Sequence, residues 1–144
     1  MAAKKKKSQK QSSGNQSPDP LFFLDESLGR TTIVNALREL GEQVIPHHER
    51  FSAGTLDKDW LTEAGTNDWV VLTKDKRIRY RSAELRALQE SNVAAFILSY
   101  GNMSGDQMAK IIKTALPEIK KFLKKQRKPF IATITKNGNI RKLK

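Results

Sequence analysis

Short apolar runs and helical repeats alternate along the middle of this chain. Four runs have the length of strands that are buried on both faces, and a polar or turn-forming segment follows each of them. The four runs are Leu21–Asp25, Gln43–Pro46, Asp68–Thr73 and Val93–Leu98. Between them, apolar residues recur at the three- and four-residue spacing of amphipathic helices. The alternation predicts an α/β fold in which a mostly parallel sheet has helices on both faces.

The helical segments between these runs have recognisable boundaries. Helices are expected at about residues 29–40, 57–64, 82–90 and 104–127. Gly41 and Gly65 are stop signals for the first two. Pro117 is expected to kink or divide the last one. The polar stretch His47–Thr55 is expected to form a loop.

The two ends of the chain have different patterns. Phe130–Thr135 and Ile140–Leu143 flank Asn137-Gly138, a dipeptide that favours the tight turn of a β-hairpin. Residues 1–20 are rich in Lys, Ser, Gln, Asn and Pro and have almost no apolar residue to bury. We therefore expect a disordered basic arm over residues 1–20 and a single folded domain over residues 21–144.

Composition narrows the class of protein. The 144 residues include no cysteine, which excludes disulfides, thiolate zinc sites and cysteine catalysis and suits a reducing compartment. No apolar run approaches the roughly 20 residues that cross a bilayer. No apolar core of a signal peptide follows the basic N-terminus. The sequence predicts a soluble, cytoplasmic protein with no membrane partner.

Charge is distributed unevenly along the chain. The net charge is +12, and it comes from the two ends. Residues 110–144 hold twelve Lys or Arg and one acid, whereas residues 21–109 hold more acids than bases. An acidic centre with basic flanks fits a cation site fed by surfaces that attract phosphates. The alternative is that the basic ends aid solubility or bind nucleic acid loosely.

Three aspartates lie where a parallel sheet places its active site. Asp25 and Asp75 follow the first and third apolar runs, and Asp57 begins a helix. Residues at such positions converge in the crevice above the carboxyl ends of the strands. Converging carboxylates repel one another unless a proton or a cation joins them, so a divalent metal ion with a phosphate polyanion is the natural interpretation. Each acid alone also fits a turn or a helix cap.

Other polar residues near these acids are secondary candidates. Basic residues crowd Asp75 and would keep it ionised or hold a phosphate. They are Lys74, Lys76, Arg77, Arg79 and Arg81. Asp59 faces a different side of its helix from Asp57. His47 and His48 lack the spacing of a zinc site, and a place on the loop surface is expected for them, with a general-base role as the alternative. The motifs of P-loop, dinucleotide-binding and serine-hydrolase enzymes are absent.

Three segments together resemble the PIN-like domain family, most closely its short VapC-like members. The segments are Phe22-Phe23-Leu24-Asp25-Glu26-Ser27-Leu28-Gly29, Asp57-x-x-Trp60-Leu61 and Trp69–Ile78. The similarity runs from about Leu21 to Leu98 and continues more weakly through Gly101-Asn102 to the strand at 129–132. The strand that leads into Thr73-x-Asp75 is its most specific part.

The resemblance implies a three-layer α/β/α domain with an acidic Mg²⁺ or Mn²⁺ site that hydrolyses RNA. By motif, Asp25, Asp57 and Asp75 would be the metal ligands and catalytic residues. Residues expected to orient them or to contact substrate are Glu26, Ser27, Asp59, Thr73, Lys74 and Arg77. The resemblance also implies a toxin that is neutralised by a protein antitoxin, and a homodimer is a further expectation. Basic residues of the C-terminal helix are expected to bind the RNA backbone, with an ordinary solvated helix face as the alternative. They are Lys120, Lys121, Lys124, Lys125 and Arg127.

The sequence also departs from the family pattern. Many PIN domains have an additional Glu between the first two aspartates, and Glu39, Glu42 and Glu49 are weak matches for it. Many also have an acid two residues after the third aspartate, where this chain has Arg77. These departures leave open whether one or two metal ions bind and whether the chain is catalytic. The alternatives are a non-catalytic nucleic-acid-binding protein and a structural interaction module.

Overall fold

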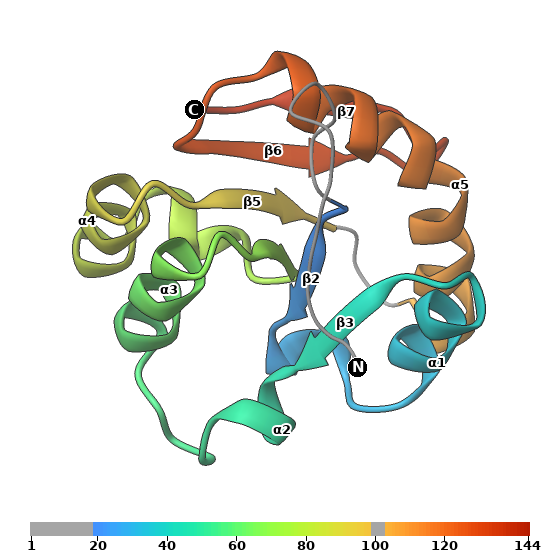
Figure 1. The fold of residues 1–144 in the computed structure, drawn as a ribbon, viewed down its shortest axis with the longest axis horizontal. Helices are drawn as coiled ribbons and strands as arrows, with labels where there is room; N and C mark the ends of the chain where they lie inside the picture. The colour runs from blue at the N-terminus through green and yellow to red at the C-terminus, as the bar shows by residue number, and fades with distance from the viewer. Residues whose placement is uncertain (1–18, 99–102) are drawn as a thin grey trace.

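The computed structural model describes residues 19–98 and 103–144, which form an α/β domain around one sheet (Figure 1). Within those residues the sheet has six strands in the order β3-β2-β4-β5-β6-β7. The strands are β2 (Leu21–Leu24), β3 (Gln43–Pro46), β4 (Val70–Thr73), β5 (Ala94–Ile97), β6 (Phe130–Ile134) and β7 (Ile140–Lys142). Neighbouring strands are parallel except β6 and β7, which form an antiparallel hairpin. The expected fold class is confirmed. Of the expected segments, the arm up to residue 18 and the Gly101-Asn102 turn lie outside the described residues.

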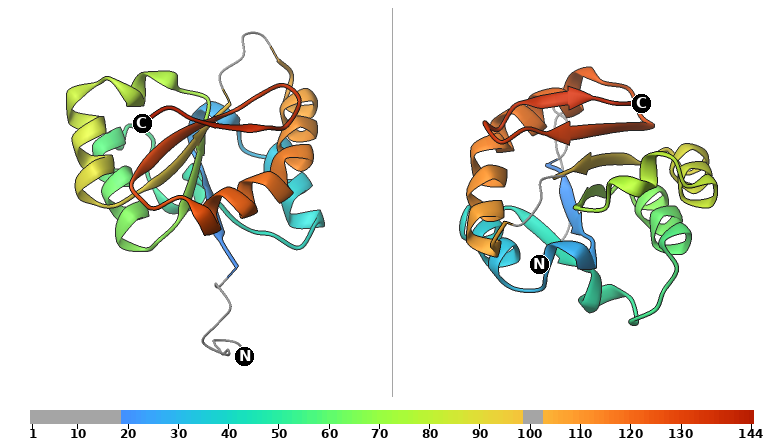
Figure 2. Two further views of the ribbon diagram at one scale, coloured as in Figure 1. Left: turned by 90° about the horizontal axis from the view of Figure 1, so that it is seen from above. Right: turned by 180° about the vertical axis from the view of Figure 1, so that it is seen from behind.

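Helices cover both faces of the sheet, which gives the three layers of the fold (Figures 1 and 2). On one face α1 (Thr32–Glu39) packs against α5 (Gly105–Lys125), and on the other α3 (Asp57–Thr66) packs against α4 (Ser82–Glu90). The short elements are η1 (Glu26–Leu28), α2 (His47–Arg50) and η2 (Lys76–Arg79). In the part of the chain that the structure describes, we find no helix with the length and hydropathy of a membrane span.

The apolar runs of the strands supply two separate cores. Successive strand residues point to opposite faces, so an unbroken apolar run is needed when both faces are covered. Phe22 and Leu24 join the core under α1 and α5, while Phe23 between them joins the core under α3 and α4. The buried stripe of α5 completes the first core and consists of Met108, Ala109, Ile112, Ala115, Leu116 and Ile119.

Gly65 brings α3 and α4 into close contact. A Cβ atom added at this position would lie 2.1 Å from the backbone oxygen of Ser91, which follows α4. No side chain tolerates such a distance, so the two helices depend on a hydrogen atom at this point. The sequence analysis treated Gly65 as the end of the helix, but α3 continues through it to Thr66.

Two other expectations about secondary structure are wrong. The stretch that begins at His47 is not simply a polar loop, because it starts with the helical turn α2, and the His47 side chain is buried with only 3% of its surface exposed. Its ring lies among those of Phe23, Phe51 and Trp60. Of the two outcomes expected at Pro117, division of the helix is wrong, because the last helix continues through it as α5. The apolar stripe on both sides of Pro117 packs on the sheet and compensates for the lost backbone hydrogen bond.

The order of the strands creates a crevice between β2 and β4. The strands β2 and β4 are neighbours in the sheet. After β2 the chain crosses to β3 on one side of this pair, and after β4 it crosses to β5 on the other side. In open parallel sheets this topological switch point is where ligands bind, above the carboxyl ends of the strands. Asp25 and Thr73-Lys74-Asp75 lie at that end of β2 and β4.

Candidate active site

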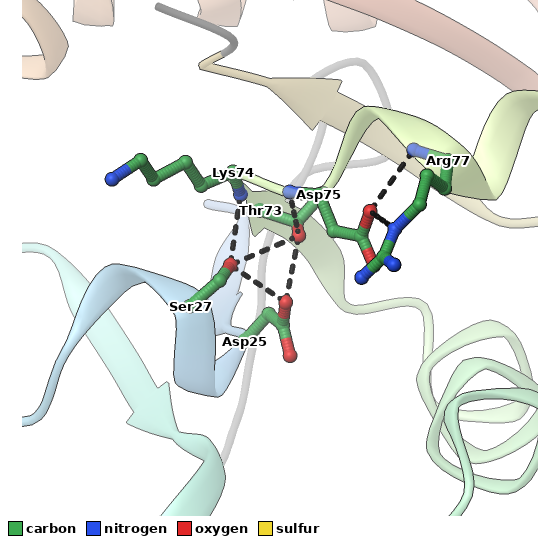
Figure 3. Close-up of polar contacts among 6 residues, drawn as sticks. All are labelled: Asp25, Ser27, Thr73, Lys74, Asp75 and Arg77. Carbon is green, nitrogen blue, oxygen red and sulfur yellow. Dashed lines mark hydrogen bonds and ion pairs between the residues drawn. The ribbon is translucent and has the colours of Figure 1, made fainter. Parts of the chain in front are cut away.

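Asp25 is a buried carboxyl group held in place by two hydroxyl groups. Only 8% of its surface is exposed. Ser27 Oγ and Thr73 Oγ1 both donate to its Oδ2, at 2.8 and 2.7 Å (Figure 3). Ser27 comes from η1 and Thr73 from the end of β4, so the carboxyl group ties two neighbouring strands together at the switch point.

The two hydroxyl groups also fix the start of the next loop. Ser27 Oγ accepts a hydrogen bond from the Lys74 backbone N–H, and Thr73 Oγ1 accepts one from the Asp75 backbone N–H, each at 3.0 Å. A hydroxyl group has one proton and two lone pairs, so each can donate to Asp25 and accept an amide at the same time. This small network determines where the backbone after β4 places Asp75.

Asp75 is bound by Arg77 through three hydrogen bonds (Figure 3). Its Oδ1 accepts the Arg77 backbone N–H at 3.0 Å and Nε at 2.9 Å, and its Oδ2 accepts a terminal nitrogen of the guanidinium at 3.3 Å. Burial by itself raises the pKa of Asp75, but these hydrogen bonds and the Arg77 and Arg81 charges outweigh it, so the pKa lies below its usual value. Asp75 is therefore ionised and already paired with a cation.

Asp57 is the first residue of α3, and its side chain is half-buried. It does not cap the helix, since Leu56 occupies the N-cap position; its Oδ1 instead accepts the indole N–H of Trp60 at 3.0 Å. Burial is the largest influence and raises the pKa of Asp57, and the charges of Asp25 and Asp75 raise it further. The Trp60 hydrogen bond and Arg81 oppose this increase without cancelling it.

All three aspartates line one open pocket of about 600 Å³ above the switch point. Its lining residues are Asp25, Ser27, Asp57, Lys74, Asp75, Lys76 and Arg77. The structure thus brings together carboxyl groups from three separate elements, as the influence of Asp25 and Asp75 on the pKa of Asp57 also indicates. Within residues 19–98 and 103–144, however, no three Asp, Glu, His or Cys side chains are grouped closely enough to hold one metal ion.

Two of the three acids in this pocket have a carboxylate oxygen that suits a hard divalent cation. Oδ1 of Asp25 and Oδ2 of Asp57 accept no hydrogen bond from any described residue. Carboxylate oxygens suit Mg²⁺ and Mn²⁺, and Mg²⁺ often uses only one or two protein carboxylates and retains several waters. Asp75 differs, because Arg77 occupies both of its oxygens.

The remaining candidate residues lie at different distances from this pocket. Lys74 lines it, but its side chain points away from the carboxyl groups (Figure 3). Glu26 and Asp59 are exposed and do not line the pocket, and Glu26 Oε1 lies 3.8 Å from Nδ1 of buried His47. The contact between Trp60 and Asp57 was not predicted, although residues three apart on a helix lie on the same face.

The sheet order and the acids above its switch point define a class of α/β proteins whose ligand site lies at the carboxyl ends of the strands. Within that class, the chain matches the family model described as PIN like domain over residues 20–100. The match covers more than half of the chain, so the chain belongs to the PIN-like domain family. This is a nuclease-type fold, and PIN-like domains are often nucleases. No curated protein and no solved structure matches the chain.

Proposed function

We propose that this chain is a metal-dependent endoribonuclease that hydrolyses RNA phosphodiester bonds in the pocket of Asp25, Asp57 and Asp75. One observation carries the proposal: in a PIN-like domain, carboxyl groups that follow β2, begin α3 and follow β4 line a single pocket at the switch point. Such a pocket suits a doubly charged ion together with a phosphate. The pocket is also open, which suits a polymer substrate.

Asp25 and Asp57 would hold Mg²⁺ or Mn²⁺, since each has one carboxylate oxygen without a partner among the described residues. When bound, such an ion lowers the pKa of a coordinated water and stabilises negative charge on the phosphate. The hydrogen bonds from Ser27 and Thr73 keep the Asp25 carboxyl group in one orientation. The side chain therefore does not have to reorient when a ligand binds. Whether one or two ions bind depends on whether Asp75 leaves Arg77.

The basic residues of the pocket would bind the RNA backbone. Lys74, Lys76 and Arg77 all line it. Arg77 presents a planar guanidinium that can form two parallel hydrogen bonds to phosphate as readily as to carboxylate. A phosphate that took Arg77 from Asp75 would free a third carboxylate. In this proposal, binding of the substrate therefore makes the third carboxylate available to the metal ion.

The test compares two aspartates of one helix. Asp57→Asn removes a charge from the pocket, and Asp59→Asn removes the same charge from an exposed position two residues away. With Mn²⁺ and a fluorogenic RNA, Asp25→Asn and Asp57→Asn are expected to lower kcat/KM by at least about 100-fold, and Asp59→Asn by less than about twofold. Equal cleavage by all three variants would refute the proposal.

A non-catalytic RNA-binding protein is the second candidate, and the Arg77–Asp75 pair favours it. An arginine on the third carboxylate, with two lysines beside it, gives the pocket its own cations. Calorimetric titration of the protein with Mn²⁺ distinguishes the two candidates. A nuclease should bind Mn²⁺ and lose this binding in Asp25→Asn, whereas the binder should show no tight uptake in either form.

A toxin with a protein antitoxin is the finer form of the nuclease proposal, and a homodimer is its expected assembly. Both rest on the family alone. Induced expression of the chain in a bacterial host should arrest growth, and Asp25→Asn should not. Growth arrest by both forms would separate toxicity from the proposed chemistry.

A further inference from the structure

A second pocket lies at the amino-terminal ends of β2, β4 and β5, opposite the end that holds the acidic pocket. Its volume is about 340 Å³, within the range of small-molecule sites. It is lined by Asp19, Pro20, Asp68, Trp69, Val70, Ala94, Lys120, Leu123, Lys124, Gln126 and Lys128. Val70 at the start of β4 belongs to this pocket and Thr73 at its end contacts Asp25, so β4 separates the two sites by roughly 10 Å.

The pocket combines an apolar floor with a cationic rim. Trp69, Val70 and Ala94 form the floor, and each is at least nine-tenths buried. The rim comes from the last turns of α5 and the segment after it, which contribute three lysines and the side-chain amide of Gln126. The ring of Trp69 itself stacks on Phe23 and lies under the Arg50 guanidinium, each at 5.5 Å. The lining therefore offers apolar contacts on the floor and cations at the rim.

The three rim lysines are not equivalent. Lys120 pairs with Glu42 at 2.7 Å, and Lys128 pairs with Asp68 at 2.5 Å. These ion pairs fix the two side chains and neutralise much of their charge. Lys124 lies between them in the sequence, is exposed, and forms no ion pair with any described residue. Among the described lysines that line the pocket, its ammonium group alone has no ion pair and is therefore available to a ligand.

Basic residues are concentrated in the segment that forms the rim, although Asp19 and Asp68 also line the pocket. Six of the nine residues from 120 to 128 are Lys or Arg. Anions are therefore attracted to this end of the molecule, and the attraction decreases as salt concentration rises.

We propose that this pocket binds a nucleotide unit, with its phosphate at Lys124 and its base or ribose on the floor formed by Trp69 and Val70. An acidic peptide would satisfy the rim but would leave the apolar floor unused. The shared ligand chemistry is a phosphorylated ribonucleoside, which is present both in a free mononucleotide and in an RNA strand. The inference goes beyond the proposed nuclease activity, because the two pockets lie at opposite ends of the strands.

Lys124→Gln tests the assignment, and Lys113→Gln is its matched control. Lys113 is exposed on the same helix, carries the same charge, and lies about 16 Å closer to the N-terminus of α5. Binding is followed by ¹H–¹⁵N NMR in EDTA, with AMP in one titration and a short single-stranded RNA in another. Trp69 and Trp60 are the two tryptophans of the chain, so two indole N–H signals report separately on the basic and the acidic pocket.

The expected result is a saturable shift of the Trp69 indole and Gln126 amide signals, with affinity lowered roughly tenfold in Lys124→Gln and unchanged in Lys113→Gln. Shifts with AMP indicate a free nucleotide as a sufficient ligand, and shifts with RNA alone indicate the polymer. Equal weakening in both variants, or no shift with either probe, overturns the proposal. Asp25→Asn should bind as the wild type does, so failure of the nuclease proposal would leave this result intact.

Discussion

Arg77 binds both carboxylate oxygens of Asp75, one of the three acids that line the candidate active site. The two residues are separated by one position in the sequence, and the turn of η2 brings the guanidinium back onto the carboxylate. Arg77 stands where many PIN domains have a further acid. A fixed cation thus occupies a position at which the family pattern expects negative charge, and it competes directly with a metal ion for Asp75.

Removing this competitor should strengthen metal binding. Arg77→Gln leaves Asp75 without its guanidinium partner, so the carboxylate becomes available and the pocket loses one positive charge. We expect calorimetry to show Mn²⁺ binding that is tighter by roughly two- to fivefold, the range set by exposed ion pairs. Arg79→Gln removes the same charge from the same turn but from outside the pocket and should change little. Weaker Mn²⁺ binding in Arg77→Gln would show that Arg77 supports the site rather than blocking it.

Thr73 should contribute stability through its hydroxyl group. Thr73→Val keeps the shape of a fully buried side chain but removes a donor to Asp25 and the acceptor of the Asp75 N–H. Leaving buried polar groups without partners should lower the free energy of unfolding by about 1–3 kcal/mol in urea denaturation. Thr62→Val removes an exposed hydroxyl on α3 and should stay within about 0.5 kcal/mol. Equal small effects in both variants would mean that water replaces the Thr73 contacts.

At Gly65, close packing against Ser91 opposes the higher helix propensity of alanine. Gly→Ala in a helix interior ordinarily stabilises by up to about 1 kcal/mol. In Gly65→Ala the new methyl group would meet the Ser91 carbonyl oxygen, a backbone atom that cannot rotate away. We expect thermal and urea denaturation to show a net loss of about 1–3 kcal/mol, as in overpacked cores. Thr66→Ala, next to it on the same helix, is the control and should be near neutral. A stabilised Gly65→Ala would mean that α3 and α4 move apart easily.

His47 is expected to be dispensable for the chemistry. Its Nδ1 is buried without a hydrogen-bond partner in the described structure, and its ring packs against Phe23, Phe51 and Trp60. His47→Phe should therefore raise the free energy of unfolding by about 1 kcal/mol and leave RNA cleavage unchanged, since His47 does not line the acidic pocket. Exposed His48→Phe is the matched control. Lost cleavage in His47→Phe alone would revive a general-base role for this residue.

The sheet and its helices were predictable because burial on both faces leaves a strong sequence pattern. Val70–Thr73 and Ala94–Ile97 are fully buried strands and appear in the sequence as unbroken apolar runs. The Asn-Gly turn before β7 was equally readable, and Gly138 adopts a positive φ of 85° there. His47 was misjudged because its burial depends on contacts with Phe23 and Trp60, which are distant in sequence, as well as with nearby Phe51. No local pattern contains that information.

The site was predictable in outline and not in detail. Strand ends converge in any parallel sheet, so the sequence indicated that Asp25, Asp57 and Asp75 share a crevice; their catalytic role stays a prediction. The pairing of Arg77 with Asp75 depends on the side-chain rotamer and the tight turn of η2, which composition does not determine. The pocket around Lys124 depends on the end of α5 lying against the starts of β4 and β5, which is a purely tertiary relationship.

The exposed edge of β7 affects whether two copies of the domain can pair through their sheets. Among the described residues β7 has a neighbour only on the β6 side, and its Arg141 and Lys142 are exposed. A free strand edge is a template for unwanted association, and positive side chains along it repel an identical edge. A second molecule that approached edge to edge would bring arginine and lysine against arginine and lysine. The charges on β7 therefore disfavour edge-to-edge pairing of two copies through this strand.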